Sequence, residues 1–402
     1  MKSYDTSTKK FFKIKKDELC EFITEFKNEH WWQSFPVSRG AFPFVIEIPD
    51  EVKVIKENAF IGLRGGINGK ICVKIPSGVE RIEKNAFSGA EIDKLYISET
   101  VSFIHSDAFR LSKIAEIEVD KANHSFKSEN GCLYNYDLNV LLRYAGEDTD
   151  YTLLPSVEVI GKRAFENSVK LECIFIPDNV VTIQDGAFYN SGIKSVSGAA
   201  RVSKMGQHVF ALCKNLTTFM MPNDITFVNH RMFYGCESLE KITLSRATTQ
   251  IGEEAFYLCT SLGEIELPED LKIIGKGAFE GCRALRTVNL PEGVTAIEER
   301  TFKGCAFFEV VVSDVVKRIE TEAFADCQRM KIITIGTAVE NMNERVFYGC
   351  QRNLIVVLKG KEKEKPLPYH RNWDELSEGI FFKKRIKNVA YVSANDTIKN
   401  YM

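Results

Sequence analysis

The apolar positions along the chain recur with a period of 22 or 23 residues, much longer than the period of one helix or strand. Phenylalanine marks this repeat most clearly, because it returns at nearly fixed spacing along most of the sequence. The twelve repeat phenylalanines are Phe60, Phe87, Phe109, Phe165, Phe188, Phe210, Phe233, Phe256, Phe279, Phe302, Phe324 and Phe347. Nine of the eleven intervals are 22 or 23 residues, and the exceptions are 27 and 56. Such a period predicts a stack of similar units.

Residues 262–282 contain one complete unit. Leu262, Ile265 and Leu267 have the alternation that places apolar side chains on one face of a short strand. Pro268 follows at once, and it ends the strand because it has no N–H to donate.

The second half of the same unit predicts another extended segment and a turn. Leu271–Ile274 forms the segment, and its last residue lies five positions before Phe279. That position is isoleucine, valine or methionine in all twelve units, and alanine precedes the phenylalanine in eight of them. Ala278–Cys282 predicts a tight turn with the aromatic ring inside. One unit of this size cannot bury its own apolar face, so about twelve stacked units predict a solenoid with one continuous core.

The unit resembles the BspA-like leucine-rich-repeat family, in which it reads L-x-x-I-x-L-P-x-x-V-x-x-I-G-x-x-A-F-x-G-C. The resemblance covers residues 41–358, and its motifs match best between Phe210 and Cys350. It implies a right-handed leucine-rich-repeat horseshoe of short parallel strands. It also implies a role in protein recognition, often in adhesion at microbial cell surfaces.

The interval of 56 residues holds an insert near residues 120–150. Asn130–Tyr144 contains two β-rich runs around a polar turn, which predicts a hairpin, and the repeat resumes at Tyr151. Similar inserts occur in proteins that this chain resembles. The hairpin is either a projection that binds a partner or a loop packed on the solenoid.

The two ends predict caps, since the terminal units of a solenoid expose apolar edges. Residues 1–40 predict a helical cap, because Leu19, Phe22, Ile23 and Phe26 have helical spacing. An exposed helix that binds a partner is the alternative. Residues 359–402 predict a C-terminal cap, whose segment 380–392 includes an edge strand.

Seven cysteines lie three residues after a repeat phenylalanine. They are Cys213, Cys236, Cys259, Cys282, Cys305, Cys327 and Cys350. Their spacing excludes the paired cysteines of zinc sites, and stacking would place their Cβ atoms too far apart for disulfides. We expect a buried column of free thiols, which suits a reducing or anaerobic setting.

Composition excludes several function classes. Lysine and arginine total 53 against 55 acidic residues, a balance that argues against a nucleic-acid-binding protein. No apolar run is long enough to span a membrane. The six histidines have no metal-binding spacing, and no nucleotide-binding or hydrolase motif is present. We therefore expect no catalytic residue, no metal and no cofactor.

The sequence gives two opposing indications of the cellular compartment. Met1–Lys16 lacks the apolar segment of a secretory signal, which favours a cytoplasmic or trimmed chain. The family resemblance implies a secreted or cell-surface protein instead. We expect a monomer with a protein partner whose identity the sequence does not give.

The sequence predicts a non-enzymatic protein that binds its partner through the concave strand face. A structural or surface-coat array without a ligand is the alternative, and an enzyme with its site in the insert or a cap is a third possibility. The third and fifth residues of each strand point away from the core. This rule selects Phe175, Thr218, Met220, Lys241, Thr243, Glu264, Glu266, Thr287, Asn289, Val310, Val312, Ile332 and Thr334 as the candidate contact residues.

The apolar members of this set have two explanations. Contiguous valines and isoleucines at positions that face water, such as Val310, Val312 and Ile332, indicate a contact site. Alternatively, they are present because β-branched residues suit a strand.

The thiol column leads to a chemical prediction. The native protein should be alkylated slowly at the seven repeat cysteines, because burial shields them from the reagent. Denatured without reductant, the chain should expose all eleven of its cysteines as modifiable thiols. Intact-mass measurement after alkylation checks both statements, and two or more disulfides among the seven would contradict them.

Overall fold

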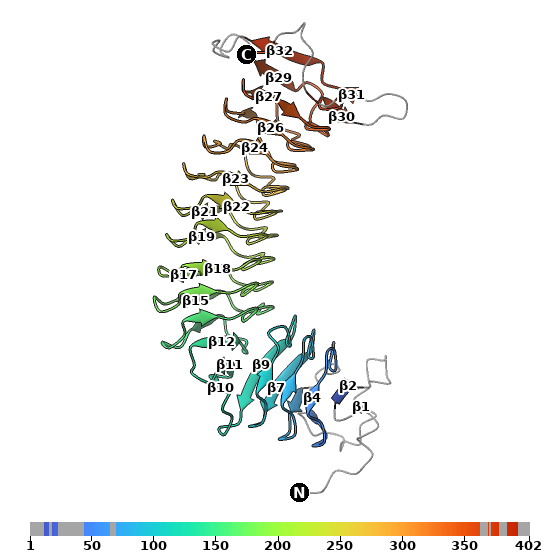
Figure 1. Ribbon diagram of the computed structural model, residues 1–402, viewed down its shortest axis with the longest axis vertical. Coiled ribbons are helices and arrows are strands. Elements are labelled where there is room, and N and C mark those ends of the chain that lie inside the picture. The colour runs from blue at the N-terminus through green and yellow to red at the C-terminus, as the bar shows by residue number, and fades with distance from the viewer. Residues whose placement is uncertain are drawn as a thin grey trace. The chain divides into compact units, whose positions relative to one another are not determined.

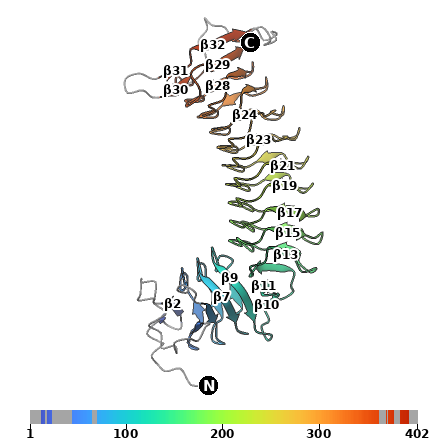
Figure 2. The same cartoon turned by 180° about the vertical axis from the view of Figure 1, so that it is seen from behind.

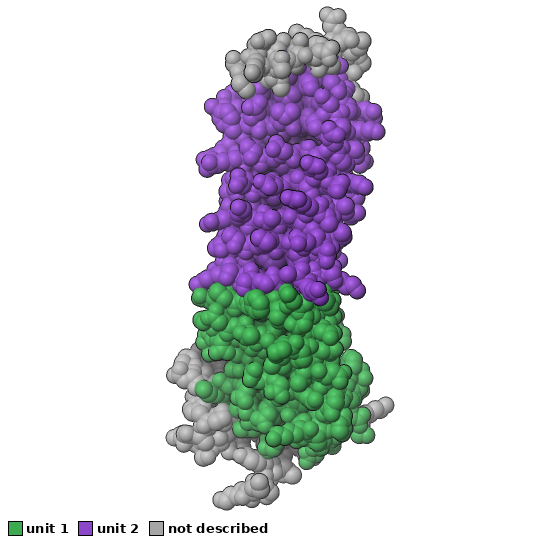
Figure 3. All heavy atoms as spheres, turned by 90° about the vertical axis from the view of Figure 1, so that its left-hand side faces the viewer, with its two compact units in different colours: residues 1–191 green, residues 192–402 purple. Residues whose placement is uncertain are grey.

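A computed structural model describes residues 12–15, 18–22, 44–64, 70–361, 369, 371–377 and 384–392. All regular secondary structure in these ranges is β-strand, as two opposite views show (Figures 1 and 2). The chain divides into two compact units, residues 1–191 and 192–402 (Figure 3). Each unit is a parallel β-solenoid whose coils contribute long and short strands.

Two parallel sheets run along the first part of unit 1. The long strands are β3 (Phe44–Glu47), β5 (Ile71–Lys74), β7 (Glu91–Ile97) and β9 (Lys113–Val119), paired in chain order. The short strands are β4 (Val54–Ile55), β6 (Arg81–Ile82) and β8 (Phe103–Ile104). Equivalent residues pair in register, so the apolar residue five positions before each phenylalanine forms a column.

The sequence predicts a helix in the N-terminal segment. This prediction is wrong for the part of the segment that the structure describes. Strands β1 (Phe12–Lys15) and β2 (Glu18–Phe22) form an antiparallel pair, and Leu19 of β2 pairs in parallel with Ile55 of β4. The free edge of β4 offers main-chain hydrogen bonds that a helix could not use, and this pairing overrides the local helical spacing. Residues 23–43 lie outside the described residues.

The insert forms three antiparallel strands, β10 (Phe126–Glu129), β11 (Cys132–Asn135) and β12 (Val140–Arg143). Asn130 and Gly131 make its first turn with φ of 51° and 76°, as a two-residue hairpin requires. Its last strand rejoins the solenoid, because β12 pairs in parallel with β14 (Val159–Ile160). Leu133, Tyr134 and Leu141 are buried, so the insert packs on the solenoid.

The repeat continues in unit 1 with β13 (Asp150–Thr152), β15 (Cys173–Ile176) and β16 (Thr182–Ile183). The long strands of unit 2 are β17 (Ser195–Gly198), β19 (Thr218–Met220), β21 (Lys241–Thr243), β25 (Glu309–Val311), β27 (Ile332–Ile335), β29 (Ile355–Lys359) and β32 (Asn388–Val392). Its short strands are β18 (Lys204–Met205), β20 (Phe227–Val228), β22 (Gln250–Ile251), β23 (Ile273–Ile274), β24 (Ala296–Ile297), β26 (Arg318–Ile319) and β28 (Asn341–Met342). An antiparallel pair, β30 (Glu375–Ser377) and β31 (Lys384–Arg385), lies near the end.

Two predicted long strands are absent from unit 2. Residues 262–267 and 285–290 are not strands, although Leu262, Ile265 and Leu285 are buried as the alternation requires. Alternation determines which side chains face the core, whereas a strand also needs ladder hydrogen bonds to the adjacent coils. In these two segments the apolar side chains face the core, but the backbone does not form a strand.

The phenylalanines form the centre of each coil. The N–H of Phe256 donates to the carbonyl of Ala278, which precedes the phenylalanine of the next coil, at 2.8 Å. The rings of Phe256 and Phe279 stack with their centroids 5.3 Å apart. Glu254 and Leu258, two positions on either side of Phe256, have φ of 51° and 57°, so the turn enters and leaves the left-handed region. Stacked phenylalanine rings of this kind occur in each unit.

The cysteine thiols donate hydrogen bonds between coils. Cys282 Sγ lies 3.2 Å from the carbonyl oxygen of Phe256, which also accepts the N–H of Cys259. Five other repeat cysteines make the equivalent contact to the preceding coil. Burial raises the pKa of Cys236, Cys259 and Cys305 well above the usual value, which keeps these thiols protonated. No disulfide joins any of the ten cysteines whose side chains are described.

Charged side chains replace part of this main-chain ladder where the insert interrupts the repeat. Gly89 donates its N–H to the carbonyl of Arg110 in the next coil at 2.8 Å. The equivalent N–H of Leu111 instead donates to Oε2 of Glu166, 55 residues further along, at 2.7 Å. Glu166 is fully buried and is ion-paired with Arg163. The break is therefore closed by a buried carboxylate.

Asp107, which precedes the insert in the chain, also forms contacts across the break. It accepts hydrogen bonds from Lys162 at 2.8 Å and from Arg163 at 3.2 Å. Tyr144 supplies the missing aromatic residue: its N–H donates to Ala164 at 2.8 Å, and its ring lies 5.2 Å from that of Phe165. Tyr144 thus begins the aromatic packing that continues through Phe165 and Phe188 after the insert.

The aromatic column predicts a large cost for a cavity. Phe256→Ala should lower the free energy of unfolding by about 3–5 kcal/mol, because Phe256 is fully buried between two stacked rings. Ile273→Ala, at a side chain that is 49% exposed, is the matched control and should cost less than about 1 kcal/mol. Urea unfolding followed by circular dichroism checks both, and similar midpoints for the two variants would refute the prediction.

The charged closure predicts a pH dependence. Burial would raise the pKa of Asp107, but the hydrogen bond from Lys162 and the charges of Lys162 and Arg163 outweigh it and lower that pKa. A lowered pKa in the folded state stabilises the fold above the unfolded-state pKa, and this contribution is lost as the pH falls through the folded-state pKa.

Asp107→Asn should therefore destabilise the protein by about 1–3 kcal/mol at pH 7 and by much less below about pH 3. Thermal melts of both proteins across this pH range give the measurement. Asp270→Asn, at an exposed turn, is the control and should shift stability by less than about 0.5 kcal/mol at every pH. A difference for Asp107→Asn that does not change with pH would contradict the assignment.

Candidate functional site

The long strands present their outward side chains on one face of each unit, which we call the long-strand face. In unit 2 the third positions hold Ser195, Thr218, Lys241, Glu264, Thr287 and Glu309. The fifth positions hold Ser197, Met220, Thr243, Glu266, Asn289 and Val311. All of these side chains are exposed except Glu309, which is half-buried. Thr218 pairs with Lys241 and Met220 with Thr243 on adjacent strands, whereas Glu264, Glu266, Thr287 and Asn289 lie in the two segments that are not strands.

Nine of the thirteen candidate contact residues are exposed as the sequence predicts. They are Phe175 in unit 1 and Thr218, Met220, Lys241, Thr243, Glu264, Glu266, Thr287 and Asn289 in unit 2. The other four, Val310, Val312, Ile332 and Thr334, are buried with at most 7% of their surface exposed. The prediction that these four face solvent is wrong, for two different reasons.

A one-residue deletion misled the prediction at Val310 and Val312. Other complete units place two residues between the cysteine and the first strand position, but only Ala306 separates Cys305 from Phe307. Phe307 is fully buried at that position, whereas the prediction counted from Phe308. A shift of one residue moves every side chain of a strand to its other face. The outward residues are therefore Glu309 and Val311.

At Ile332 and Thr334 the predicted register is right, but the face is covered. Ile332 packs with Val357 and Val392 in a second apolar cluster, with Ile355 and Ala390 beside it. These residues lie on the outward side of β27, β29 and β32, whose pairing places Ile332 opposite Ile355. The added strand β32 thus helps to convert the end of the long-strand face into a small core.

The exposed face of unit 2 carries apolar side chains that the sequence analysis missed. Phe308 is 56% exposed and Val311 is 52% exposed; Met220, which the sequence analysis selected, is 73% exposed. The ammonium group of Lys331 lies 4.6 Å from the ring centroid of Phe308. The spacing between Cys305 and Phe307 is the signal that could have identified Phe308 and Val311.

Charged side chains lie on part of the long-strand face of unit 1, on β7 and β9. The ammonium group of Lys94 on β7 lies 2.7 Å from Glu116 and 2.8 Å from Glu118 on β9. The hydrogen bond to Glu116 and then that to Glu118 raise the pKa of Lys94 above its usual value. The Lys94 ammonium also lies 4.8 Å from the ring centroid of Tyr96. Side chains of this face are thus fixed by their neighbours on adjacent strands.

The described histidines have structural contacts. Nδ1 of His105 accepts the N–H of Asp107 at 3.0 Å, and Nδ1 of His230 accepts the N–H of Glu253 at 3.1 Å. Within the described residues, no three histidine, cysteine or acidic side chains are grouped as metal ligands would be. The described ranges also contain no helix with the length and apolarity that crossing a membrane requires.

Comparison with known proteins agrees with this geometry. The family model described as "BspA type Leucine rich repeat region (6 copies)" matches residues 45–141, 144–263 and 249–364. The chain is similar to a leucine-rich repeat protein of Eubacterium ventriosum, with 25% identity and a TM-score of 0.56 over 65% of this chain and 76% of that one. No curated protein is significantly similar to the chain.

Two further solved structures show weaker similarity. A leucine rich cell surface protein of Faecalibacterium prausnitzii is 22% identical over 68% of this chain and 98% of that one, with a TM-score of 0.39. A leucine-rich repeat protein of Bacteroides ovatus is 21% identical over 82% of each chain, also with a TM-score of 0.39.

Proposed function

Because the chain belongs to the family of BspA type leucine rich repeats, we propose that it is a non-enzymatic scaffold that binds a partner protein through its long-strand face. Repeat solenoids of this kind present extended surfaces on which side chains from successive coils act together. We further propose that it acts at the cell surface or after secretion, in adhesion or recognition, as is typical of the family.

One observation carries the proposal: in unit 2, the inward positions repeat while the outward positions differ. The first inward positions are Leu216, Leu239, Leu262 and Leu285, all fully buried. The outward positions run through hydroxyl, basic, acidic and amide side chains, and they include the exposed apolar groups of Met220 and Val311. Packing explains the first set. It does not explain exposed methionine and valine, which a contact surface would use.

A structural array without a specific ligand is the second candidate. The regular inward positions support it as well, because stacking alone requires them. The two functions differ in one measurable respect: a binding protein has a saturable partner whose affinity depends on the long-strand face, and an array does not.

Paired variants of the full chain test the proposal. Met220→Asp with Val311→Asp places two carboxylates among exposed side chains of the face. Val181→Asp with Ile273→Asp makes the same chemical change at two side chains, 41% and 49% exposed, that lie next to or in short strands. Proteins retained from cell-surface extracts by the wild-type chain are identified, purified and measured by surface plasmon resonance.

We expect the face variant to weaken binding at least tenfold, because a charge at a desolvated contact costs more than 1.4 kcal/mol. The control variant should bind like the wild type, and both variants should keep the wild-type circular dichroism spectrum and melting temperature. Equal affinities for all three proteins would exclude the long-strand face of unit 2 as the contact. Absence of any saturable partner would favour the structural array.

A further inference from the structure

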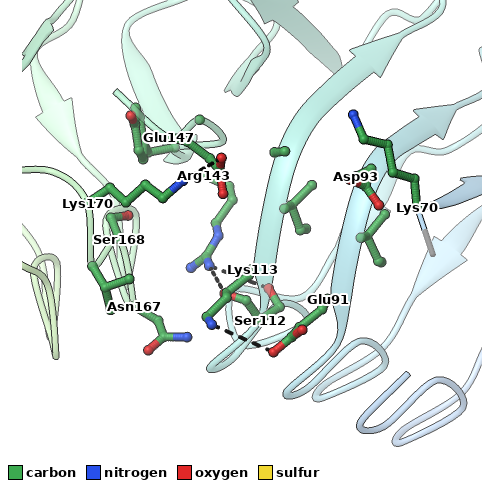
Figure 4. Close-up of a pocket in the computed structure, with 16 residues that line it drawn as sticks. Lys70, Glu91, Asp93, Ser112, Lys113, Arg143, Glu147, Asn167, Ser168 and Lys170 are labelled. Atoms are coloured by element: carbon green, nitrogen blue, oxygen red, sulfur yellow. Dashed lines mark hydrogen bonds and ion pairs between the residues drawn. The ribbon is translucent and has the colours of Figure 1, made fainter. Parts of the chain in front are cut away.

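A cavity opens in unit 1 beside the break in the repeat. It has a volume of about 600 Å³, within the range of small-ligand sites. Its walls come from the first residues of β7 and β9, from the end of the insert, and from the turn after Phe165 (Figure 4). The proposed long-strand function does not use this cavity.

Arg143 lines the cavity with only 3% of its surface exposed. Its Nη1 donates to the carbonyl of Arg163 at 3.1 Å, and its Nη2 donates to the carbonyl of Ser112 at 2.6 Å. Its Nε–H is buried and has no acceptor among the described residues. In Figure 4 the guanidinium lies among the lining residues, between Lys170 on one side and Lys113 on the other. A buried donor without an acceptor costs about 1–3 kcal/mol, and the guanidinium keeps its positive charge beside the cavity.

The charges around this arginine do not balance. The charged side chains that bridge the break in the repeat are three cations and two anions. The cations are Arg143, Lys162 and Arg163, and the anions are Asp107 and Glu166. The sum is 3 − 2 = +1. Hydrogen bonds and ion pairs described above connect Lys162, Arg163, Asp107 and Glu166. Arg143 is connected to them by its hydrogen bond to the carbonyl of Arg163 and by its attraction to Glu166. One positive charge is therefore left beside the cavity.

The rim of the cavity does not supply the missing anion. The ammonium group of Lys113 is 3.7 Å from Glu91, and that of Lys170 is 2.7 Å from Glu147. Asp93 accepts the N–H of Ile71 at 2.7 Å. Asp93 and exposed Lys70 are in no ion pair with a described residue, and their opposite charges offset each other, so the rim leaves the excess of one positive charge unchanged.

We propose that this cavity binds a carboxylate group, with Arg143 as its fixed cation and Lys70 as a second cation at the rim. A carboxylate accepts charge-assisted hydrogen bonds from guanidinium groups and would neutralise the single excess charge. A phosphate dianion fits less well, because three acidic side chains already line the walls. The carboxylate belongs either to an acidic side chain of a peptide or to a small free acid.

Isothermal titration of the full chain at low ionic strength tests the proposal. The probes are acetyl-Gly-Glu-Gly-amide, its glutamine counterpart, succinate and inorganic phosphate. We expect the glutamate peptide to bind at least tenfold more tightly than the glutamine peptide, because only the former carries the anion. Succinate that binds as tightly as the glutamate peptide identifies a small acid as the ligand, and tighter binding of the peptide identifies an acidic segment.

Variants of the lining residues complete the test. Arg143→Met and Lys70→Met should each weaken binding of the glutamate peptide at least fivefold, while Lys272→Met, at an exposed lysine of unit 2, should not change it. If Arg143→Met does not fold, the affinity of Lys70→Met for the glutamate peptide still tests the proposal. No binding of the glutamate peptide at about 10 mM, equal binding of both peptides, or tighter binding of phosphate would overturn the proposal. Met220→Asp with Val311→Asp should leave this titration unchanged, so it is independent of the long-strand face.

Discussion

The structure of each unit depends on one hydrogen bond, from the N–H of a repeat phenylalanine to the residue before the next one. It recurs with lengths from 2.7 to 3.0 Å, as from Phe60 to Ala86 and from Phe324 to Val346. Because it joins equivalent residues, it sets the register of the coils and stacks their rings. The small residue before the phenylalanine and the left-handed residues around it follow from the same turn. The thiol of the repeat cysteine then uses the second lone pair of a carbonyl that already accepts one N–H.

The break in unit 1 shows what the fold requires when this hydrogen bond cannot form. The carboxylates of Glu166 and Asp107 bridge the break, and Tyr144 packs its ring against Phe165 where the repeat resumes. Main-chain groups are neutral dipoles, but their replacements carry charge, and buried charges must be compensated by neighbours. The excess positive charge beside Arg143 is a consequence of this replacement. A repair of the solenoid thus produces the chemical features of a binding cavity.

Sequence periodicity predicted the architecture because each inward position is repeated many times, so single exceptions do not obscure it. It predicted nine outward residues correctly by the same alternation. It failed at Val310 and Val312 because one deleted residue between Cys305 and Phe307 reverses the faces of a strand. It failed at the N-terminal segment because the partner of Leu19, Ile55 of β4, is distant in sequence. Glu166 and Arg143 could not be recognised for the same reason, since their contacts cross the insert.

The stacking of coils has a mechanical consequence. Within each unit, a coil contacts mainly the coil before it and the coil after it, so a force applied along the stack would load these contacts in series. A force applied at β32 of unit 2 would first separate this strand from β29, with which it pairs in parallel. Each further step would remove one ring and its hydrogen bonds, at a nearly constant force, because the steps are chemically alike. The unit would extend like a strip that peels one turn at a time, and would dissipate energy at every turn.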